Sequence, residues 1–99
     1  MTSVPTPLGP DTVLRAVPGH WLAEVANETV VLHHATAQYF GLNEVGTRVW
    51  SLLADGASIE ELSQGLAREY GLAPERIQGD LLPFLRELLA TGLAEVVRE

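Results

Sequence analysis

The sequence feature that constrains the fold most is a change of hydrophobic period at Asn43. Before it, three short runs at residues 21–25, 29–33 and 38–42 have the alternation and the β-branched or aromatic content of strands. After it, apolar residues recur every three or four positions, as in helices. Short connections between the runs predict an antiparallel meander. We therefore expect an α+β fold: a three-stranded antiparallel sheet followed by a three-helix bundle, an order similar to a winged helix-turn-helix.

Capping residues predict where each of the three helices begins. Asn43 is a good N-cap for the first helix, and Pro74 suits the first turn of the third. Ser58 and Glu61 have the spacing of a capping box, which opens the second helix. Pro83 lies inside the third helix and predicts a bend or a loosened turn there. Glycines end the three helices: Gly56, Gly71 and Gly92.

The chain is short enough for one domain. Its first 11 residues contain three prolines and predict a flexible lead-in without packed structure. Residues 12–15 read as a short extended piece, and residues 93–97 as a short strand or an extended tail. We expect residues 12–99 to form a single domain.

Composition excludes several classes of function. The net charge of −7, with all six basic residues arginine, argues against nucleic acid or an anionic membrane as the main partner. The absence of cysteine excludes disulfides and thiolate chemistry, and it fits a reducing cytoplasm. No apolar run approaches the roughly 18 residues of a membrane span. The first five residues lack the basic start and apolar stretch of a signal peptide, so we expect none.

Catalytic and metal-binding patterns are weak. The sequence has no nucleophile elbow, zinc-protease helix or phosphate-binding loop, so we expect no enzyme activity and no cofactor. If His33 and His34 both lie on a strand, their adjacent side chains point to opposite faces and cannot hold one ion together. His20 adds at most one further ligand to either, so we expect no metal site.

Residues 38–42 form the last strand of the expected meander. They contain no lysine, proline or charge, which are the usual protections of an exposed strand edge. Such an edge can accept an extended peptide as an added strand. The alternative is that residues 93–97 or the lead-in cover it.

The same region resembles a known family. Residues 39–46 (YFGLNEVG), followed by Val49 and Trp50, are similar to the coenzyme PQQ synthesis protein D family, also called the recognition element of ribosomally synthesised and modified peptides. The similarity spans about residues 21–97. It continues through residues 53–62 and 70–71, then Asp80, Leu81, Phe84, Leu85, Leu88, Gly92 and Leu93.

The resemblance implies three antiparallel strands, a winged three-helix bundle and binding of the N-terminal leader of a precursor peptide. The leader would dock as a fourth strand on the third strand and pack against the third helix. We select the flank of that helix that mixes an aromatic ring with polar groups, rather than the flank of Leu85 and Leu89. The candidate peptide-binding residues are then Gln38, Tyr39, Phe40, Gly41, Leu42, Asp80, Pro83, Phe84 and Glu87.

Two subclasses of the family are weighed. The PQQ protein itself usually has a Tyr-Pro-Glu-Gly stretch before the third strand, where this chain has residues 34–37 (HATA). Residues 39–43 and Trp50 look more like the stand-alone leader-binding proteins of lasso-peptide clusters. That resemblance implies a leader with a Tyr-x-x-Pro element, held by Tyr39, Phe40 and Phe84. The implied partners are a separate cysteine leader peptidase and, as a further candidate, an asparagine-synthetase-like cyclase. The alternatives are a PQQ-pathway peptide chaperone and a winged helix-turn-helix DNA-binding regulator.

Overall fold

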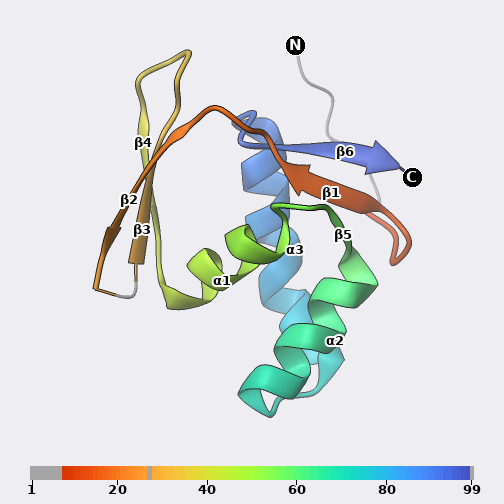
Figure 1. Ribbon diagram of the computed structural model, residues 1–99. Coiled ribbons are helices and arrows are strands. Elements are labelled where there is room, and N and C mark those ends of the chain that lie inside the picture. The colour runs from red at the N-terminus through yellow and green to blue at the C-terminus, as the bar shows by residue number, and fades with distance from the viewer. Residues whose placement is uncertain (1–7, 27, 99) are drawn as a thin grey trace.

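The computed structural model describes residues 8–26 and 28–98 and confirms an α+β fold with antiparallel sheets and three helices (Figure 1). In chain order the elements are β1 (Val13–Ala16), β2 (Trp21–Val25), β3 (Glu28–Leu32), β4 (Tyr39–Leu42), α1 (Glu44–Leu52), β5 (Ala57–Ser58), α2 (Ile59–Tyr70), α3 (Pro74–Ala90) and β6 (Ala94–Arg98).

The strands form two sheets rather than one. The first has the order β2-β3-β4 and is the meander that the sequence predicts. The second has the order β5-β1-β6, all antiparallel, and was not anticipated as a sheet. Figure 1 shows the first sheet to the left and the second at the upper right, with α1 between them. The expectation of one sheet followed by helices is therefore incomplete.

The second sheet joins segments from opposite ends of the chain. Leu14 of β1 is aligned with Val96 of β6, and Arg15 with Glu95. The first described residues are also packed, because Leu8 is buried and the Pro10 carbonyl accepts a hydrogen bond from the Glu60 N–H. The prediction of an unpacked lead-in is wrong for residues 8–11. Residues 1–7 lie outside the described part of the chain.

The strand boundaries of the meander differ slightly from the predicted ones. β2 matches the prediction, whereas β3 begins at Glu28 and ends before His33. The predicted turn residue Asn27 lies outside the described residues. Gln38 precedes β4, so the docking strand is one residue shorter than predicted.

The predicted N-terminal signals are confirmed, whereas of the three predicted terminal glycines only Gly71 is a C-cap; α1 and α3 are capped by Leu53 and Thr91. Asn43 accepts a hydrogen bond from the Gly46 N–H at 2.8 Å, and Ser58 and Glu61 form both bonds of a capping box. Gly71 ends α2 at φ 66°, in the left-handed region that glycine enters without steric cost. α3 is assigned as one helix through Pro83. No helix within residues 8–26 and 28–98 is long and apolar enough to span a bilayer.

The core lies where both sheets meet the three helices, with Val31 of β3 and Leu42 of β4 buried in it. Leu14 of β1, Leu53 after α1 and Leu93 before β6 are fully buried. α3 contributes one continuous apolar stripe to this core: Ile77, Leu81, Leu85, Leu88 and Leu89. Because these side chains are taken up by packing, the flank of α3 with Phe84 and Glu87 remains beside β4.

Candidate functional site

β4 is an edge strand of its sheet. It pairs with β3 on one side, and the order β2-β3-β4 leaves its other side without a partner strand among the described residues. The C-terminal strand β6, which the sequence left as a possible cover, pairs with β1 instead. Strand addition at β4 therefore needs no displacement of a described strand.

The ladder with β3 determines which backbone groups of β4 point outward. The His33 N–H donates to the Gln38 carbonyl at 2.9 Å, which makes these two residues a hydrogen-bonded pair. Hydrogen-bonded pairs alternate along an antiparallel ladder, so Phe40 and Leu42 also face β3. Tyr39 and Gly41 consequently direct their N–H and C=O groups to the open side.

The end of the ladder supports this alternation. The Thr47 hydroxyl of α1 accepts from the Thr29 N–H at 3.1 Å and donates to the Leu42 carbonyl at 3.2 Å. These two backbone groups therefore face each other across β3 and β4, as members of a hydrogen-bonding pair do. The hydroxyl also ties α1 to the last residue of β4.

A groove of about 580 Å³ lies between β4 and α3. Phe40 and Phe84 are half-buried in it, and Leu88 is buried below them. Its charged lining residues are Glu28 and Glu87, and no arginine lines it among the described residues. The groove therefore has an apolar floor and an acidic border. Its full lining is Glu28, Thr29, Val30, Tyr39, Phe40, Gly41, Leu42, Asn43, Phe84, Glu87, Leu88 and Thr91.

A second, more apolar hollow of about 500 Å³ adjoins the groove and shares Asn43 and Phe84 with it. Gly46 of α1 lines the second hollow, and a Cβ at this position would lie 3.3 Å from the Phe84 ring. The remaining lining residues are Val45, Val49, Leu66, Tyr70, Leu72, Ile77, Asp80 and Leu81.

The structure brings most of the predicted site residues together. Asp80 lines the second hollow instead of the groove, and Gln38 and Pro83 line neither. Leu85 and Leu89, on the rejected flank of α3, are buried in the core. Peptide binding by these residues stays a prediction. Those that line the groove are Tyr39, Phe40, Gly41, Leu42, Phe84 and Glu87.

Sequence reasoning missed other residues of the groove. Thr91 follows Glu87 by one helical turn, so the helical period contained the signal that would have found it. Asn43 was assigned only a capping role, and Leu88 only a core role. Glu28, Thr29 and Val30 come from β3, and their place depends on a pairing register that the sequence pattern did not define.

The outer face of the first sheet is apolar and exposed. Trp21, Leu32 and Tyr39 are aligned across its three strands. The Trp21 side chain is 72% exposed and that of Tyr39 is 74% exposed, and Val25 on the same face is 66% exposed. Large aromatic residues exposed together mark interaction surfaces more often than residues exposed singly.

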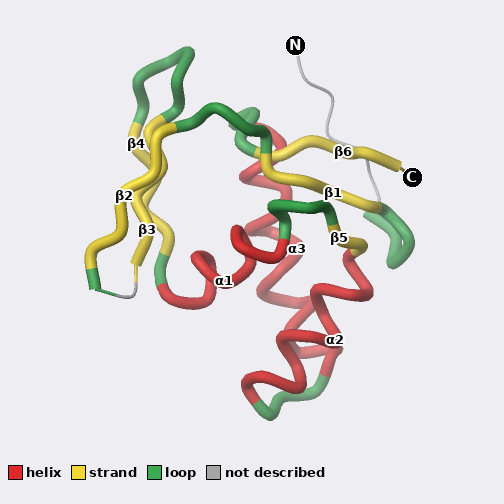
Figure 2. The backbone as a smooth tube through the Cα atoms, in the orientation of Figure 1, coloured by secondary structure: helices red, strands yellow, loops and turns green. Residues whose placement is uncertain are grey.

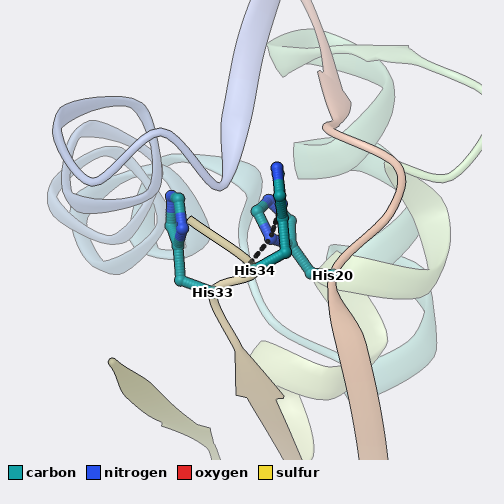
Figure 3. Close-up of side chains that lie close together, drawn as sticks. All are labelled: His20, His33 and His34. Carbon is teal, nitrogen blue, oxygen red and sulfur yellow. Dashed lines mark hydrogen bonds between the residues drawn. The ribbon is translucent and has the colours of Figure 1, made fainter. Parts of the chain in front are cut away.

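Three histidines gather where the two sheets meet (Figure 3). His20 lies between β1 and β2, and His33 and His34 follow β3, with ligand atoms within 4.8 Å of one another. The rings of His33 and His34 are stacked, with centroids 5.5 Å apart. The prediction that these two point to opposite faces is wrong, because both lie beyond the end of the strand.

Hydrogen bonds decide what this cluster can bind. The Nδ1 atom of His33 accepts from the N–H groups of Ala35 at 3.1 Å and Thr36 at 3.3 Å. The Nδ1 atom of His20 accepts from the His34 N–H at 3.2 Å. A neutral imidazole that accepts at Nδ1 carries its proton on Nε2 and has no lone pair left for a metal. The described conformation therefore does not suit a three-histidine metal site.

Burial lowers the pKa of His20, and the neighbouring His33 and His34 lower it further. The backbone of Gly92 opposes this weakly, since the buried Nε2 atom lies close to it without a hydrogen bond of good geometry. Desolvation and like charge both disfavour the imidazolium form. The neutral form of His20 is consequently favoured at this junction.

Fold and groove define a small α+β domain with an open strand edge facing a helix. The chain belongs to the family described as coenzyme PQQ synthesis protein D, whose model matches residues 28–94. This confirms the resemblance seen in the sequence.

Two solved structures are similar to the chain over most of its length. "TbiB1 in complex with the TbiA(beta) leader peptide" is 37% identical with a TM-score of 0.73, covering 82% of this chain and 94% of that one. The second is the PqqD truncation of Methylobacterium extorquens PqqCD, described as a functional, stand-alone recognition element of ribosomally synthesised and modified peptides. It is 26% identical with a TM-score of 0.74, covering 91% of this chain and 96% of that one. Among curated proteins, no sequence matches.

Proposed function

We propose that this protein binds the leader segment of a ribosomally synthesised precursor peptide, which adds to β4 as a fourth strand. The observation that carries the proposal is the edge of β4, which has no partner strand within residues 8–26 and 28–98 and faces α3 across the groove. The family membership and the leader complex of the 37% identical TbiB1 support it. We place this role in lasso-peptide biosynthesis and in the cytoplasm, where a ribosomal product is first present.

The backbone of β4 supplies the register of binding. Tyr39 and Gly41 offer outward N–H and C=O groups, and an added Cβ at Gly41 would meet nothing within 4 Å. Alternate leader side chains then point into the groove or toward the outer face of the sheet. We assign the apolar contacts to Phe40, Phe84 and Leu88.

Charge in the groove predicts the chemistry of the leader. Glu28 and Glu87 border it, so a basic or neutral leader segment is favoured over an acidic one. Tyr39 points its side chain to the outer face, since it alternates with the half-buried Phe40. The walls for a Tyr-x-x-Pro element are therefore Phe40 and Phe84, without the Tyr39 ring.

We propose that the protein is not catalytic and works by presenting the leader to other enzymes. A separate leader peptidase is the first candidate, and the cyclase is the second. We assign the peptidase to the outer face with Trp21 and Tyr39, because this face continues into the edge where the leader lies. A partner there contacts the protein and its bound leader together.

We describe the first sheet and the three helices as similar to a winged helix-turn-helix. This description does not make the chain a DNA-binding regulator, because a net charge of −7 opposes the approach of phosphate. The PQQ-pathway role is the second candidate within the family, and residues 34–37 (HATA) depart from its usual motif.

N-methylation of single leader amides tests strand addition without changing the protein. Methylation of a leader amide that faces Tyr39 or Gly41 should weaken leader binding by about 0.5–1.5 kcal/mol or more. The next amide in the leader points away from the edge, so its methylation should weaken binding much less. Affinities from fluorescence anisotropy, with an unmethylated leader as control, give the pattern. Equal losses at successive amides would reject the added strand.

A further inference from the structure

His33 organises the turn between β3 and β4. Its N–H donates to the Gln38 carbonyl at 2.9 Å, and its carbonyl accepts from the Ala37 N–H at 2.8 Å. Its Nδ1 atom accepts from the N–H groups of Ala35 and Thr36 at 3.1 and 3.3 Å. One buried residue thus makes four hydrogen bonds within the turn that leads into β4. Figure 2 shows this turn as the green loop that joins β3 to β4.

The turn depends on these bonds because part of its backbone is strained. Ala37 has φ 60°, a left-handed conformation that residues with a Cβ rarely adopt. Only Gln38 separates Ala37 from β4, where Tyr39 and Gly41 carry the outward backbone groups. A turn that relaxes at Ala37 therefore changes the position of the docking edge.

The side-chain part of this arrangement requires an uncharged ring. Protonation of His33 would place an N–H at Nδ1, so that it would face the donors of Ala35 and Thr36. The titratable groups in contact with His33 are His20, with ring centroids 4.6 Å apart, and His34. The turn between α3 and β6 presents the uncharged Gly92 to its Nε2 atom.

We propose that neutral His33 is a positioning residue for the docking strand β4, and that leader binding and protonation of His33 oppose each other. This inference rests on the proposed addition of the leader to β4. Histidine changes its charge between about pH 5 and pH 8. Leader affinity is therefore highest at the alkaline end of this range and falls as the pH is lowered.

Leader titrations at about pH 8 and about pH 5.5 test the proposal. At the lower pH the wild-type protein should bind the leader about tenfold more weakly than at the higher pH. This loss corresponds to the two hydrogen bonds that the Nδ1 atom of His33 accepts in the turn. His33→Asn retains an acceptor oxygen near the position of Nδ1 but does not titrate. It should bind nearly as well as wild type at the higher pH and lose less than about threefold at the lower. His34→Ala, the adjacent exposed histidine, is the control and should keep the full pH dependence.

Ring-nitrogen NMR shifts of the free protein separate this inference from the proposed function. At about pH 8 the proposal requires His33 to carry its proton on Nε2, with Nδ1 unprotonated. The amide signals of Ala35 and Thr36 should then shift together with the titration of the His33 ring. This measurement uses the wild-type protein alone, without leader peptide and without a variant.

The outcomes divide clearly. Constant leader affinity across the pH range, or a full pH dependence in His33→Asn, overturns the role of His33 and leaves leader binding intact. Absence of leader binding at both pH values overturns the proposed function. In that case a proton on Nδ1 of His33 also overturns the turn arrangement, whereas a proton on Nε2 supports it.

Discussion

The two sheets of this protein are built in opposite ways. The β2-β3-β4 sheet joins neighbours in sequence, and every residue of β2 is exposed. The β5-β1-β6 sheet joins residues near both ends of the chain, and its Leu14 is completely buried. Both sheets reach the core, since Val31 of β3 is as completely buried as Leu14. Among the described residues, the first sheet in addition carries the open edge of β4, an exposed outer face and the groove.

This difference separates stability from recognition. A strand with few buried side chains contributes little to the free energy of unfolding, so its edge and faces are available for partners. The long-range sheet instead holds α2 and the C-terminal strand against the core, through Ala57 and Ala94 as well as Leu14. Substitutions in the two sheets should therefore affect different measurements.

Leu14→Ala should give the largest effect. Leu14 is 0% exposed, and truncation of such a leucine costs about 2–5 kcal/mol of unfolding free energy. Leu22→Ala in β2 is the matched control, because Leu22 is 55% exposed and should cost about 0.5 kcal/mol or less. Urea denaturation monitored by tryptophan fluorescence measures both. Equal losses in the two variants would contradict the division of roles between the sheets.

Gly46→Ala should affect recognition more than stability. The new Cβ would lie 3.3 Å from both the Phe84 ring and the Asn43 Oδ1 atom, so these neighbours must shift by a few tenths of an ångström. We expect leader affinity to fall about threefold to tenfold, equivalent to about 0.7–1.4 kcal/mol. Gly65→Ala in α2 is the control, since its Cβ meets nothing within 4 Å. It should gain about 0.5–1 kcal/mol of stability and leave binding unchanged. A threefold or greater loss of affinity in both variants would show that the loss does not arise from contact with Phe84.

The same contrast explains what the sequence could predict. Local signals located the meander, the capping box at Ser58 and the left-handed Gly71, because each depends on residues close in sequence. β5 has only two residues, and its pairing with β1 is set by tertiary contacts. The packing of Leu8 was missed for the same reason, since prolines nearby suggested a free segment.

The candidate site divides in the same way. The edge strand and the helix flank could be predicted because alternation and the helical period place side chains on faces. Asp80 shares the flank of Phe84 but lies one turn nearer the second hollow, a distance that periodicity alone does not resolve. The approach of three histidines was missed because His33 and His34 lie in a turn, where strand geometry does not apply.

Acidification should lower the stability of the protein at the junction between the sheets, by less than the Leu14→Ala substitution. The pKa of His20 is lowered in the folded protein, so the unfolded chain binds the proton more readily. Stability is then complete above the ordinary histidine value of about 6.5 and falls as the pH decreases toward the lowered folded pKa. Thermal unfolding at several pH values measures this, and His20→Asn should reduce the slope between about pH 5 and pH 7. If the dependence of stability on pH is the same in His20→Asn as in wild type, other groups cause the loss of stability at low pH.

The ion pair between β1 and β6 should give the smallest effect. Arg15 and Glu95 are aligned on the two strands and meet at 2.7 Å, with a second hydrogen bond of 2.9 Å to the same carboxylate oxygen. Their side chains are 51% and 42% exposed, so water and salt screen most of the attraction. A double-mutant cycle with Arg15→Ala and Glu95→Ala should give a coupling of about 0.2–1 kcal/mol that decreases at high salt. A salt-independent coupling well above that range would show that this ion pair, as well as the burial of Leu14, stabilises the second sheet. The difference in stability between the two sheets would then be partly electrostatic.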